Sequence, residues 1–258
     1  SLRRRQRQMC IRDRPDMEEE KMKERSFRYG TFKLGDARQL IKTVPDGSID
    51  LIFTDPPFGF GKFEHDVADV FFELEDEFWR VAKENAWLIF YWPETKLPEA
   101  FKLKRFEYRG QLIAVHFRPQ YGPASVRHYT SILVFSKGKP KLHFRIKSIL
   151  PASELPIVIG RVPSPLFKPT AVNAIILGAF TREGDVVLDP FAGYGSIPIV
   201  CELFKRRWIA FEIDEDVYDY AIKAIEEMRV TPRKKTKKHV DGVWILLTSP
   251  AFNRGETA

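Results

Sequence analysis

The sequence predicts an α/β fold of the Rossmann-like kind, with a mostly parallel sheet, an antiparallel hairpin and helices on both faces. Apolar runs of strand length alternate with segments of helical spacing. Several runs are apolar at successive positions, as expected for strands that are covered on both faces. The chain has 258 residues, of which 44% are hydrophobic. That is enough for one sizeable domain of this class.

The first half of the domain contains a strand, a helix and then strands. We expect, in order, a strand at Ile49–Thr54, a helix at His65–Asn85, a strand at Ala86–Trp92, and an antiparallel pair at Gly110–Phe117 and Thr130–Ser136. The helix has an apolar stripe at helical spacing, formed by Val67, Val70, Phe71, Leu74, Phe78 and Val81.

In the second half of the domain, helices and strands alternate more regularly. We expect a helix at Pro169–Phe180, a strand at Asp185–Asp189, a helix at Gly195–Arg206, a strand at Arg207–Ile213 and a helix at Asp214–Arg229. We assign residues 17–230 to the domain. Residues 1–16 are arginine-rich without apolar periodicity and are interpreted as a non-native or disordered leader. Residues 231–258 form a basic C-terminal tail.

Charge and cysteine content limit the class of protein. The net charge is +7, and the stretch 111–170 holds nine Lys and Arg against one acidic residue. Such a local excess indicates a surface for a polyanion, although a solvated charged face is the simpler alternative. Two cysteines and five scattered histidines show no metal-ligand spacing. No apolar run reaches the length of a membrane span, and we expect an intracellular, cytoplasmic protein without a metal.

The strand at Ile49–Thr54 ends on Asp55, Pro56, Pro57 and Phe58. Two adjacent prolines stop a strand and fix the backbone that follows it. Proline also keeps its carbonyl acceptor while lacking an N–H donor. The stretch therefore presents a carboxylate, a carbonyl and an aromatic ring at the carboxyl end of a predicted parallel strand, where ligands of such sheets bind.

A second signal follows the strand at Asp185–Asp189. Gly193 and Gly195 lie in a turn that opens a helix, so the backbone there can approach a ligand closely. The dinucleotide pattern G-x-G-x-x-G fails, because its third position is Pro198. Glu212 ends the next strand, and a carboxylate there suits the two hydroxyls of a ribose. Together these features indicate a crevice for a nucleoside; a mere tight turn is the alternative.

The motif "DPPF" at Asp55–Phe58, followed by "DPFAGYGS" at Asp189–Ser196, resembles the S-adenosylmethionine-dependent amino-methyltransferases of DNA. This family carries (D/N/S)PP(Y/F) and FxGxG motifs. The catalytic motif comes first here, which is similar to the permuted β group of N6-adenine and N4-cytosine enzymes. The resemblance extends over about Tyr29–Met228. It departs from the family at Ser196, where threonine is usual, and at "PLFKPT", a reduced form of the usual His-Pro-Thr-Gln-Lys-Pro run.

The resemblance implies roles for individual residues. Asp55, Pro56, Pro57 and Phe58 would be catalytic, and the cofactor S-adenosylmethionine would be bound by Asp36, Lys168, Asp189, Phe191, Gly193, Gly195, Ser196 and Glu212. Asp36 has the alternative role of a helix cap before Ala37. Lys168 has the alternative of being solvated. Cys201 lies in an apolar helical pattern and is interpreted as a structural thiol, which disfavours methylation at cytosine C5.

The basic stretch would then be part of a target-recognition segment at about 118–165. Its candidate DNA contacts are Arg118, Arg127, Lys137, Lys139, Lys141 and Arg145. The predicted activity is transfer of a methyl group to N6 of adenine in DNA, on a flipped base. Asp rather than Ser before the two prolines favours adenine. N4 of cytosine, RNA adenine and a catalytically silent nucleic-acid-binding scaffold remain as alternatives, as do a monomer and a homodimer.

Overall fold

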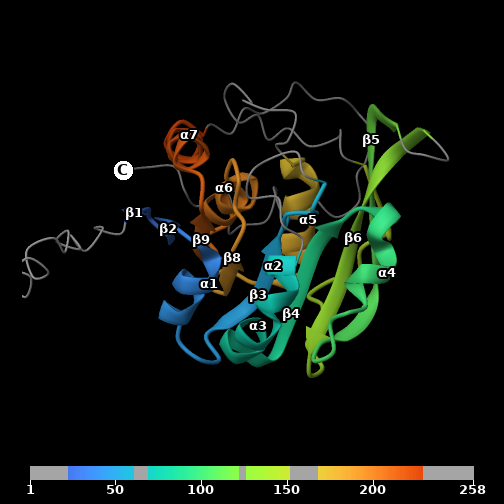
Figure 1. Ribbon diagram of the computed structural model, residues 1–258, viewed down its shortest axis with the longest axis horizontal. Helices are drawn as coiled ribbons and strands as arrows, with labels where there is room; N and C mark the ends of the chain where they lie inside the picture. Colours follow the sequence, from blue (N-terminus) through green and yellow to red (C-terminus); the bar gives the residue numbers. More distant parts are fainter. Residues whose placement is uncertain (1–22, 61–68, 122–125, 152–167, 229–258) are drawn as a thin grey trace, which may run out of the picture.

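The computed structural model describes residues 23–60, 69–121, 126–151 and 168–228 (Figure 1). The leader, the C-terminal tail and most of the second half of the target-recognition segment lie outside these residues. The described chain folds around one sheet of nine strands, in the order β1-β2-β9-β8-β3-β4-β6-β5-β7. The strands are β1 Glu24–Ser26, β2 Gly30–Leu34, β3 Ile49–Thr54, β4 Ala82–Trp92, β5 Glu107–Tyr121, β6 Val126–Lys137, β7 Ile149–Pro151, β8 Val186–Asp189 and β9 Arg207–Glu212.

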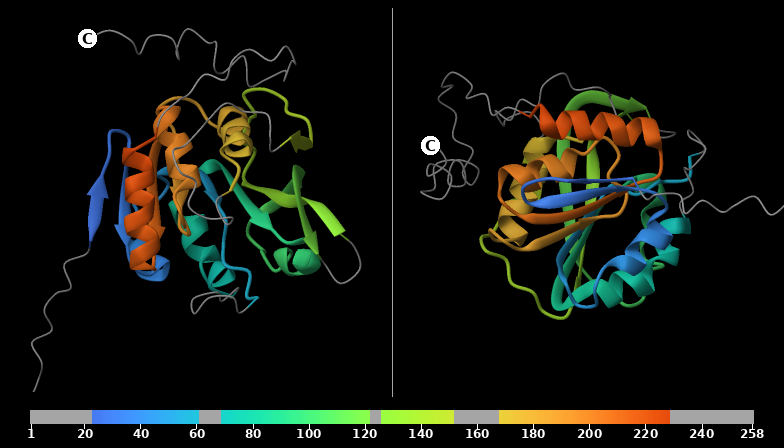
Figure 2. Two further views of the ribbon diagram at one scale, coloured as in Figure 1. Left: turned by 90° about the horizontal axis from the view of Figure 1, so that it is seen from above. Right: turned by 90° about the vertical axis from the view of Figure 1, so that its left-hand side faces the viewer.

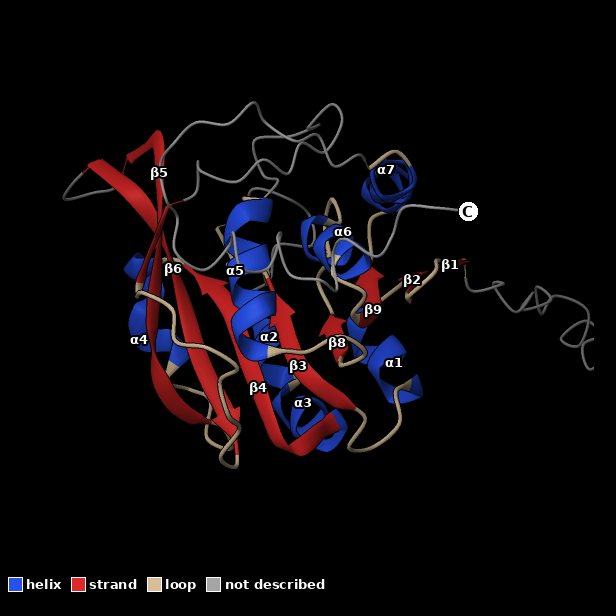
Figure 3. Ribbon diagram, turned by 180° about the vertical axis from the view of Figure 1, so that it is seen from behind, coloured by secondary structure: helices blue, strands red, loops and turns tan. Residues whose placement is uncertain are grey.

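The sheet is mostly parallel, which confirms the predicted fold class. Strands β2, β9, β8, β3 and β4 all pair in parallel, and β6 joins β4 in antiparallel fashion. Strands β5 and β6 form the predicted antiparallel hairpin, longer than expected at both ends. Figure 3 shows β8, β3 and β4 side by side at the centre of the sheet.

Helices cover both faces of this sheet (Figure 2). They are α1 Ala37–Leu40, α2 Asp69–Glu73, α3 Glu75–Val81, α4 Leu97–Ala100, α5 Thr170–Phe180, α6 Ser196–Leu203 and α7 Glu215–Glu226, with 3-10 turns η1 Ile41–Thr43 and η2 Glu94–Lys96. Helices α5, α6 and α7 pack on one face, and α1 to α4 pack on the other.

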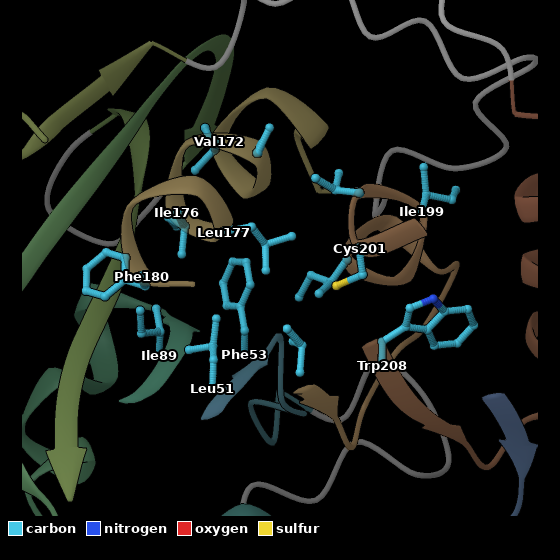
Figure 4. Close-up of a cluster of buried hydrophobic side chains, with 14 of the residues drawn as sticks. Leu51, Phe53, Ile89, Val172, Ile176, Leu177, Phe180, Ile199, Cys201 and Trp208 are labelled. Carbon is cyan, nitrogen blue, oxygen red and sulfur yellow. The ribbon is translucent and has the colours of Figure 1, made fainter. Parts of the chain in front are cut away.

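The two faces form two separate cores because alternate residues of a strand point to opposite sides. In β4, Ile89 and Tyr91 enter the core under α5, whereas Phe90 and Trp92 enter the core under α2 and α3. Figure 4 shows the first of these cores, with Phe53 of β3 pointing toward α5. Cys201 lies in the same core and is fully buried, as expected for a structural thiol.

The predicted helix at His65–Asn85 is wrong at its carboxyl end. Helix α3 ends at Val81, and Ala82 already has extended backbone and pairs with Ile49 as the start of β4. Val81 is the last member of the apolar stripe, and after the buried Ala82 the residues Lys83 to Asn85 are exposed. A longer helix would therefore bury nothing more, whereas the strand gains ladder hydrogen bonds. The other predicted helices and strands of the second half are confirmed with ends shifted by a few residues.

Candidate active site

The two motifs meet at adjacent strand ends. Asp55 follows β3 and Asp189 ends β8, and these two strands are neighbours in the sheet. From β3 the chain continues outward to β4, and from β8 it continues in the other direction to β9. The motifs therefore lie at the point where the strand order reverses, which is where a crevice opens in sheets of this kind.

A buried hydrogen bond joins the two strand ends. Thr54 Oγ1 donates to Asp189 Oδ1 at 2.7 Å, and the Phe191 backbone N–H donates to the same oxygen at 3.4 Å. Burial, together with the nearby carboxylates of Asp55 and Glu212 and against the effect of these hydrogen bonds, raises the pKa of Asp189 to about 8. Below that pH, Asp189 is mainly a neutral carboxylic acid.

Asp55 is paired with Lys168, which precedes α5. The Lys168 Nζ lies 2.8 Å from Asp55 Oδ2. About a quarter of the Asp55 side chain is exposed, yet Oδ1 is enclosed and is the one buried side-chain oxygen without a hydrogen bond in the described part of the chain. Burial raises the pKa of Asp55, and the charge of Lys168 opposes this rise. Lys168 is thus not simply solvated.

Aromatic rings surround the ammonium group of Lys168. It lies 5.6 Å from the centre of the Phe58 ring and 5.3 Å from that of Tyr91, within the range of cation–π attraction. Phe58 in turn meets Trp92 edge to face at 5.9 Å. These contacts hold the cation beside the Asp55 carboxylate and place Phe58 next to the same ion pair.

Glu212 organises the glycine loop from the end of β9. Its Oε2 accepts a hydrogen bond from the Gly193 N–H at 2.8 Å, and its Oε1 accepts from the Ile213 and Asp214 N–H groups at 2.8 and 2.9 Å. Burial raises the pKa of Glu212, while these donors lower it. Oε2, which accepts a single bond, keeps acceptor capacity for a further donor such as a hydroxyl.

Both glycines of the loop have left-handed backbone, with φ of 51° at Gly193 and 79° at Gly195. A Cβ on Gly195 would lie 3.2 Å from the Ala221 Cβ of α7, so this glycine allows α6 and α7 to pack closely. A Cβ on Gly193 would meet nothing within 4 Å. Gly193 therefore borders open space above the sheet, beside the Glu212 carboxylate.

Asp36 lies next to Glu212, because β2 pairs with β9 and the Gly35 N–H donates to the Glu212 carbonyl at 2.7 Å. It caps α1 by accepting from the Arg38 N–H at 2.8 Å, and it also binds the Arg38 guanidinium. The alternative role of a helix cap is therefore confirmed. Arg38 contacts both oxygens of Asp36, so a ligand contact there would replace part of the pairing with this half-exposed arginine side chain.

The structure divides the basic residues between opposite edges of the sheet. Arg118 and Arg127 belong to the part of the β5–β6 hairpin that extends beyond the pairing of Trp92 with Ser131. This part reaches past the carboxyl end of β4, at the edge where Asp55 lies (Figure 1). The other predicted DNA contacts lie in or after the far end of β6.

Lys137 pairs in the sheet with Ala86, near the start of β4. Its ammonium donates to the carbonyls of Trp79 and Ala82 at 3.0 Å and lies over the Trp79 ring, so it closes the end of α3. This structural role of Lys137 has no signal in the local sequence. Arg145 is exposed in the segment between β6 and β7.

Lys139 and Lys141 border a cleft of about 370 Å³ at the amino edge of the sheet, on the side opposite Asp55. It is lined by Asp50, Asn85, Trp87, Lys139, Pro140, Lys141, His143, Phe180, Arg182 and Asp185. The structure therefore does not bring these two lysines to the motifs.

A buried polar network was missed by the sequence analysis. Tyr91 Oη donates to Asn173 Oδ1 at 2.7 Å, and Asn173 Nδ2 donates to Ser196 Oγ at 3.3 Å. Tyr91 and Asn173 are fully buried and come from β4 and α5. The only signal in the sequence was a polar residue in an otherwise apolar helix, which indicates a buried hydrogen bond.

The described residues contain neither a cluster of metal ligands nor a membrane-spanning helix. Within the described ranges, no three or more His, Cys, Asp or Glu side chains gather in a way that could hold a metal ion. Among the same residues, no helix is long and apolar enough to cross a membrane.

Part of the chain matches a known family of enzymes. Residues 163–223 match the family model of the N6/N4 methyltransferases, described as DNA methylase. This match covers Lys168, α5 and the glycine loop, and the Asp55–Phe58 motif follows the neighbouring strand β3. This match, together with the order of the two motifs, makes the chain similar to the S-adenosylmethionine-dependent DNA amino-methyltransferases.

Individual relatives agree with this assignment. The chain is 26% identical to the type II methyltransferase M.HpaI of Haemophilus parainfluenzae over 229 residues, covering 72% of this chain and 70% of that protein. It is 25% identical to the DNA adenine methyltransferase YhdJ of Escherichia coli (strain K12) over 256 residues, covering 78% and 87%. The fold matches that of the PvuII DNA methyltransferase (cytosine-N4-specific) with a TM-score of 0.63, at 17% identity, covering 82% and 89%.

Proposed function

We propose that this DNA methyltransferase acts on N6 of adenine and that Asp55 is its central catalytic residue. The observation that carries the proposal is the Asp55 carboxylate itself, whose buried Oδ1 accepts no hydrogen bond within the described residues. An amine N–H of a target base would satisfy this oxygen. Aspartate at the first motif position and the likeness to YhdJ, named as a DNA adenine methyltransferase, both favour adenine.

The residues of the site fit S-adenosylmethionine. The open space beside Gly193 gives room next to the glycine loop, and Glu212 and Asp36 lie together where ribose and adenine acceptors are needed. The carboxyl groups of Asp55 and Glu212 suit a positively charged ligand, and such a ligand would also favour ionisation of Asp189. When bound, the cofactor supplies a methyl group attached to positively charged sulfur.

The chain's own residues prepare the target amine. An exocyclic amine is a poor nucleophile, because its lone pair is delocalised into the ring. Asp55 Oδ1 accepts one N–H and the Pro56 carbonyl accepts the other, which favours a tetrahedral nitrogen with an available lone pair. Phe58 holds the base by stacking. Because burial raises the pKa of Asp55, its carboxylate can take up the proton that the amine loses.

Lys168 keeps the carboxylate ionised before the base arrives. Its ammonium stabilises the negative charge on Asp55 Oδ2 and leaves Oδ1 for the substrate. A buried carboxyl group without such a partner would be protonated more readily and would accept poorly. Lys168 is thus proposed to stabilise the ionised Asp55 carboxylate as well as to flank the methionine part of the cofactor.

DNA is proposed to lie across the carboxyl edge, with Arg118 and Arg127 of the hairpin contacting phosphates. A base inside a duplex cannot reach Asp55, so it must flip out of the helix. The second candidate function is N4-cytosine methylation, which is favoured by the structural likeness to the cytosine-N4-specific PvuII enzyme.

The direct test of the catalytic assignment is transfer of labelled methyl groups to DNA by the wild type and Asp55→Ala. We expect the variant to lose at least about 100-fold in rate, the usual scale for losing a residue that acts on the reacting group. Asp46→Ala is the matched control, because Asp46 is an exposed carboxylate that pairs with Arg80. Full activity in Asp55→Ala would overturn the mechanism, and DNA binding without transfer by either protein would favour a silent scaffold.

A further inference from the structure

We propose that Tyr91 and Asn173 are positioning residues that fix the direction in which Ser196 donates its hydroxyl proton. In this proposal, which rests on the cofactor site above, the acceptor is the methionine carboxylate of S-adenosylmethionine. The underlying observation is the buried chain of hydrogen bonds from Tyr91 through Asn173 to Ser196. It links the strand beside the catalytic motif to the loop of the cofactor motif.

The geometry sets the direction of each bond. Tyr91 Oη donates to Asn173 Oδ1 at 2.7 Å, which leaves the Asn173 amide nitrogen to face Ser196. An amide nitrogen has only donors, so Ser196 Oγ must accept this bond, at 3.3 Å. The proton of the Ser196 hydroxyl is therefore free to point elsewhere. Without the Tyr91 hydroxyl as donor, the Asn173 side-chain amide is free to flip by 180°. Its Oδ1 would then accept the proton of the Ser196 hydroxyl.

The position of Ser196 favours an anion as the acceptor. Ser196 is the first residue of α6, directly after the left-handed Gly195. Helix N-termini have a partial positive charge and favour negative groups. A hydroxyl whose proton is held away from Asn173 adds a directed donor at this point. Of the groups on the cofactor, the carboxylate is the one that this arrangement suits.

The ring of Tyr91 has a second function in the same site. One contact is with Phe53, stacked at 6.0 Å, and another is with the Lys168 ammonium, 5.3 Å from the ring centre. Figure 4 shows Phe53 between the sheet and α5, in the core that Tyr91 shares. The hydroxyl of Tyr91 thus acts on Ser196, whereas its ring supports Lys168 beside Asp55. The two functions can be separated by substitution.

Ligand binding tests the proposed function of the Tyr91 hydroxyl. We expect Tyr91→Phe to weaken binding of S-adenosylhomocysteine by about 5- to 10-fold, the usual effect of one hydrogen bond. Binding of 5′-methylthioadenosine, which has no amino-acid carboxylate, should change less than 2-fold. Isothermal titration calorimetry measures both. Asn173→Leu should act like Tyr91→Phe, and Asn173→Asp should weaken the first ligand more, because a carboxylate would accept the Ser196 proton.

The pH dependence of methyl transfer tests whether the Tyr91 ring supports Lys168. Tyr91→Phe retains the ring and should leave the acid limb of the rate profile unchanged. Tyr91→Leu removes the support of Lys168 and should move that limb to higher pH. Thermal unfolding of every variant shows whether it is folded under the assay conditions. A merely structural role for Tyr91 would change neither the ligand preference nor the pH limb selectively.

Two results would overturn the proposal in different ways. If Ser196→Ala weakens S-adenosylhomocysteine binding but Tyr91→Phe and Asn173→Leu do not, the positioning role is wrong and the cofactor site stands. If Ser196→Ala has no effect on either ligand, the assignment of Ser196 to the cofactor site is wrong as well. Equal weakening of both ligands by Tyr91→Phe would also contradict a role specific to the carboxylate.

Discussion

At the scale of single residues, the site is governed by carboxyl groups that are buried near one another. Asp55, Asp189 and Glu212 each have a raised pKa with burial as the main cause. What differs is the partner: Lys168 for Asp55, the Thr54 hydroxyl for Asp189 and backbone N–H groups for Glu212. Among these three, Asp55 has a cation within ion-pair distance, which suits it to act as the ionised acceptor.

Removing that cation should shift the pH dependence of activity. In Lys168→Met the pKa of Asp55 loses the influence that lowers it, so ionisation requires a higher pH. We predict that the acid limb of the rate profile moves upward by roughly 1–3 pH units, the usual effect of an opposite charge at this distance. Lys168→Arg should keep the limb near its original position. An unchanged profile in Lys168→Met would contradict the role of the ion pair.

Asp189 should make the folded protein less stable as the pH rises. Its pKa is about 8 in the folded protein against 3.8 as the ordinary value, so between these values the folded state holds a proton that the unfolded state has lost. Stability is then full below about pH 4 and falls up to about pH 8, by at most about 1.4 kcal/mol per pH unit. Asp189→Asn resembles the protonated acid and should lack this component.

Denaturant unfolding at pH 5 and pH 8.5 checks the prediction for Asp189. Relative to the wild type, Asp189→Asn should be more stable at the higher pH than at the lower one. Asp46→Asn, at an exposed position, is the control for a general charge effect. The same difference at both pH values would show that Asp189 is ionised throughout.

At the scale of elements, the site depends on where strands end and how the glycine loop turns into α6. Gly195 has φ of 79°, and a Cβ there would press on Ala221. Gly47 has φ of 57° with nothing within 4 Å of an added Cβ. The two glycines therefore share the backbone conformation and differ in packing.

Replacing each glycine with alanine should separate the cost of a left-handed backbone from the cost of crowding between α6 and α7. Gly47→Ala should lower the free energy of unfolding by roughly 1 kcal/mol and leave cofactor binding unchanged. Gly195→Ala should cost more stability and weaken cofactor binding, because α6 and α7 must move apart. Equal losses in the two variants, with unchanged binding, would show that the close contact with α7 is unimportant.

The elements were predicted well where the pattern of apolar residues is decisive. The strands β3, β8 and β9 and the helices α5, α6 and α7 are covered by the core, so their sequences report burial directly. The start of β4 was missed, because Lys83 to Asn85 are exposed and resemble the end of a helix. The short strands β1 and β7 are held by pairing with neighbours and have no periodicity of their own.

The same contrast holds for the site. The positions of Asp55 and Asp189 follow from strand ends that the next residue, a proline, marks, and Glu212 comes at the end of an apolar run before an acidic helix start. The pairing of Asp55 with Lys168, and the network from Tyr91 to Ser196, depend on how α5 lies over the sheet. Contacts between residues so far apart in sequence do not follow from local patterns.

At the scale of the whole molecule, the basic residues lie at two opposite edges of the sheet. A parallel strand of six residues spans about 20 Å, so the two edges are separated by roughly the width of a DNA duplex. The hairpin residues Arg118 and Arg127 lie at the edge of Asp55, whereas Lys139 and Lys141 lie at the other. One duplex presented to Asp55 would contact the hairpin first.

Charge reversal at the two edges tests this orientation. We predict that Arg118→Glu with Arg127→Glu weakens DNA binding by at least about 10-fold and reduces its salt dependence by about two phosphate contacts. Cofactor binding should be unchanged. Lys139→Glu with Lys141→Glu is the matched control and should have a much smaller effect. The reverse order of effects would place DNA at the amino edge instead.

The identity of the methylated base tests the central claim most directly. DNA treated with the wild type and S-adenosylmethionine carrying a deuterated methyl group is digested to nucleosides, which are identified by mass spectrometry. We predict deuterated N6-methyldeoxyadenosine, absent when Asp55→Ala replaces the wild type. Deuterated N4-methyldeoxycytidine would contradict the assignment to adenine, and label in the DNA treated with Asp55→Ala at the wild-type level would contradict the catalytic role of Asp55.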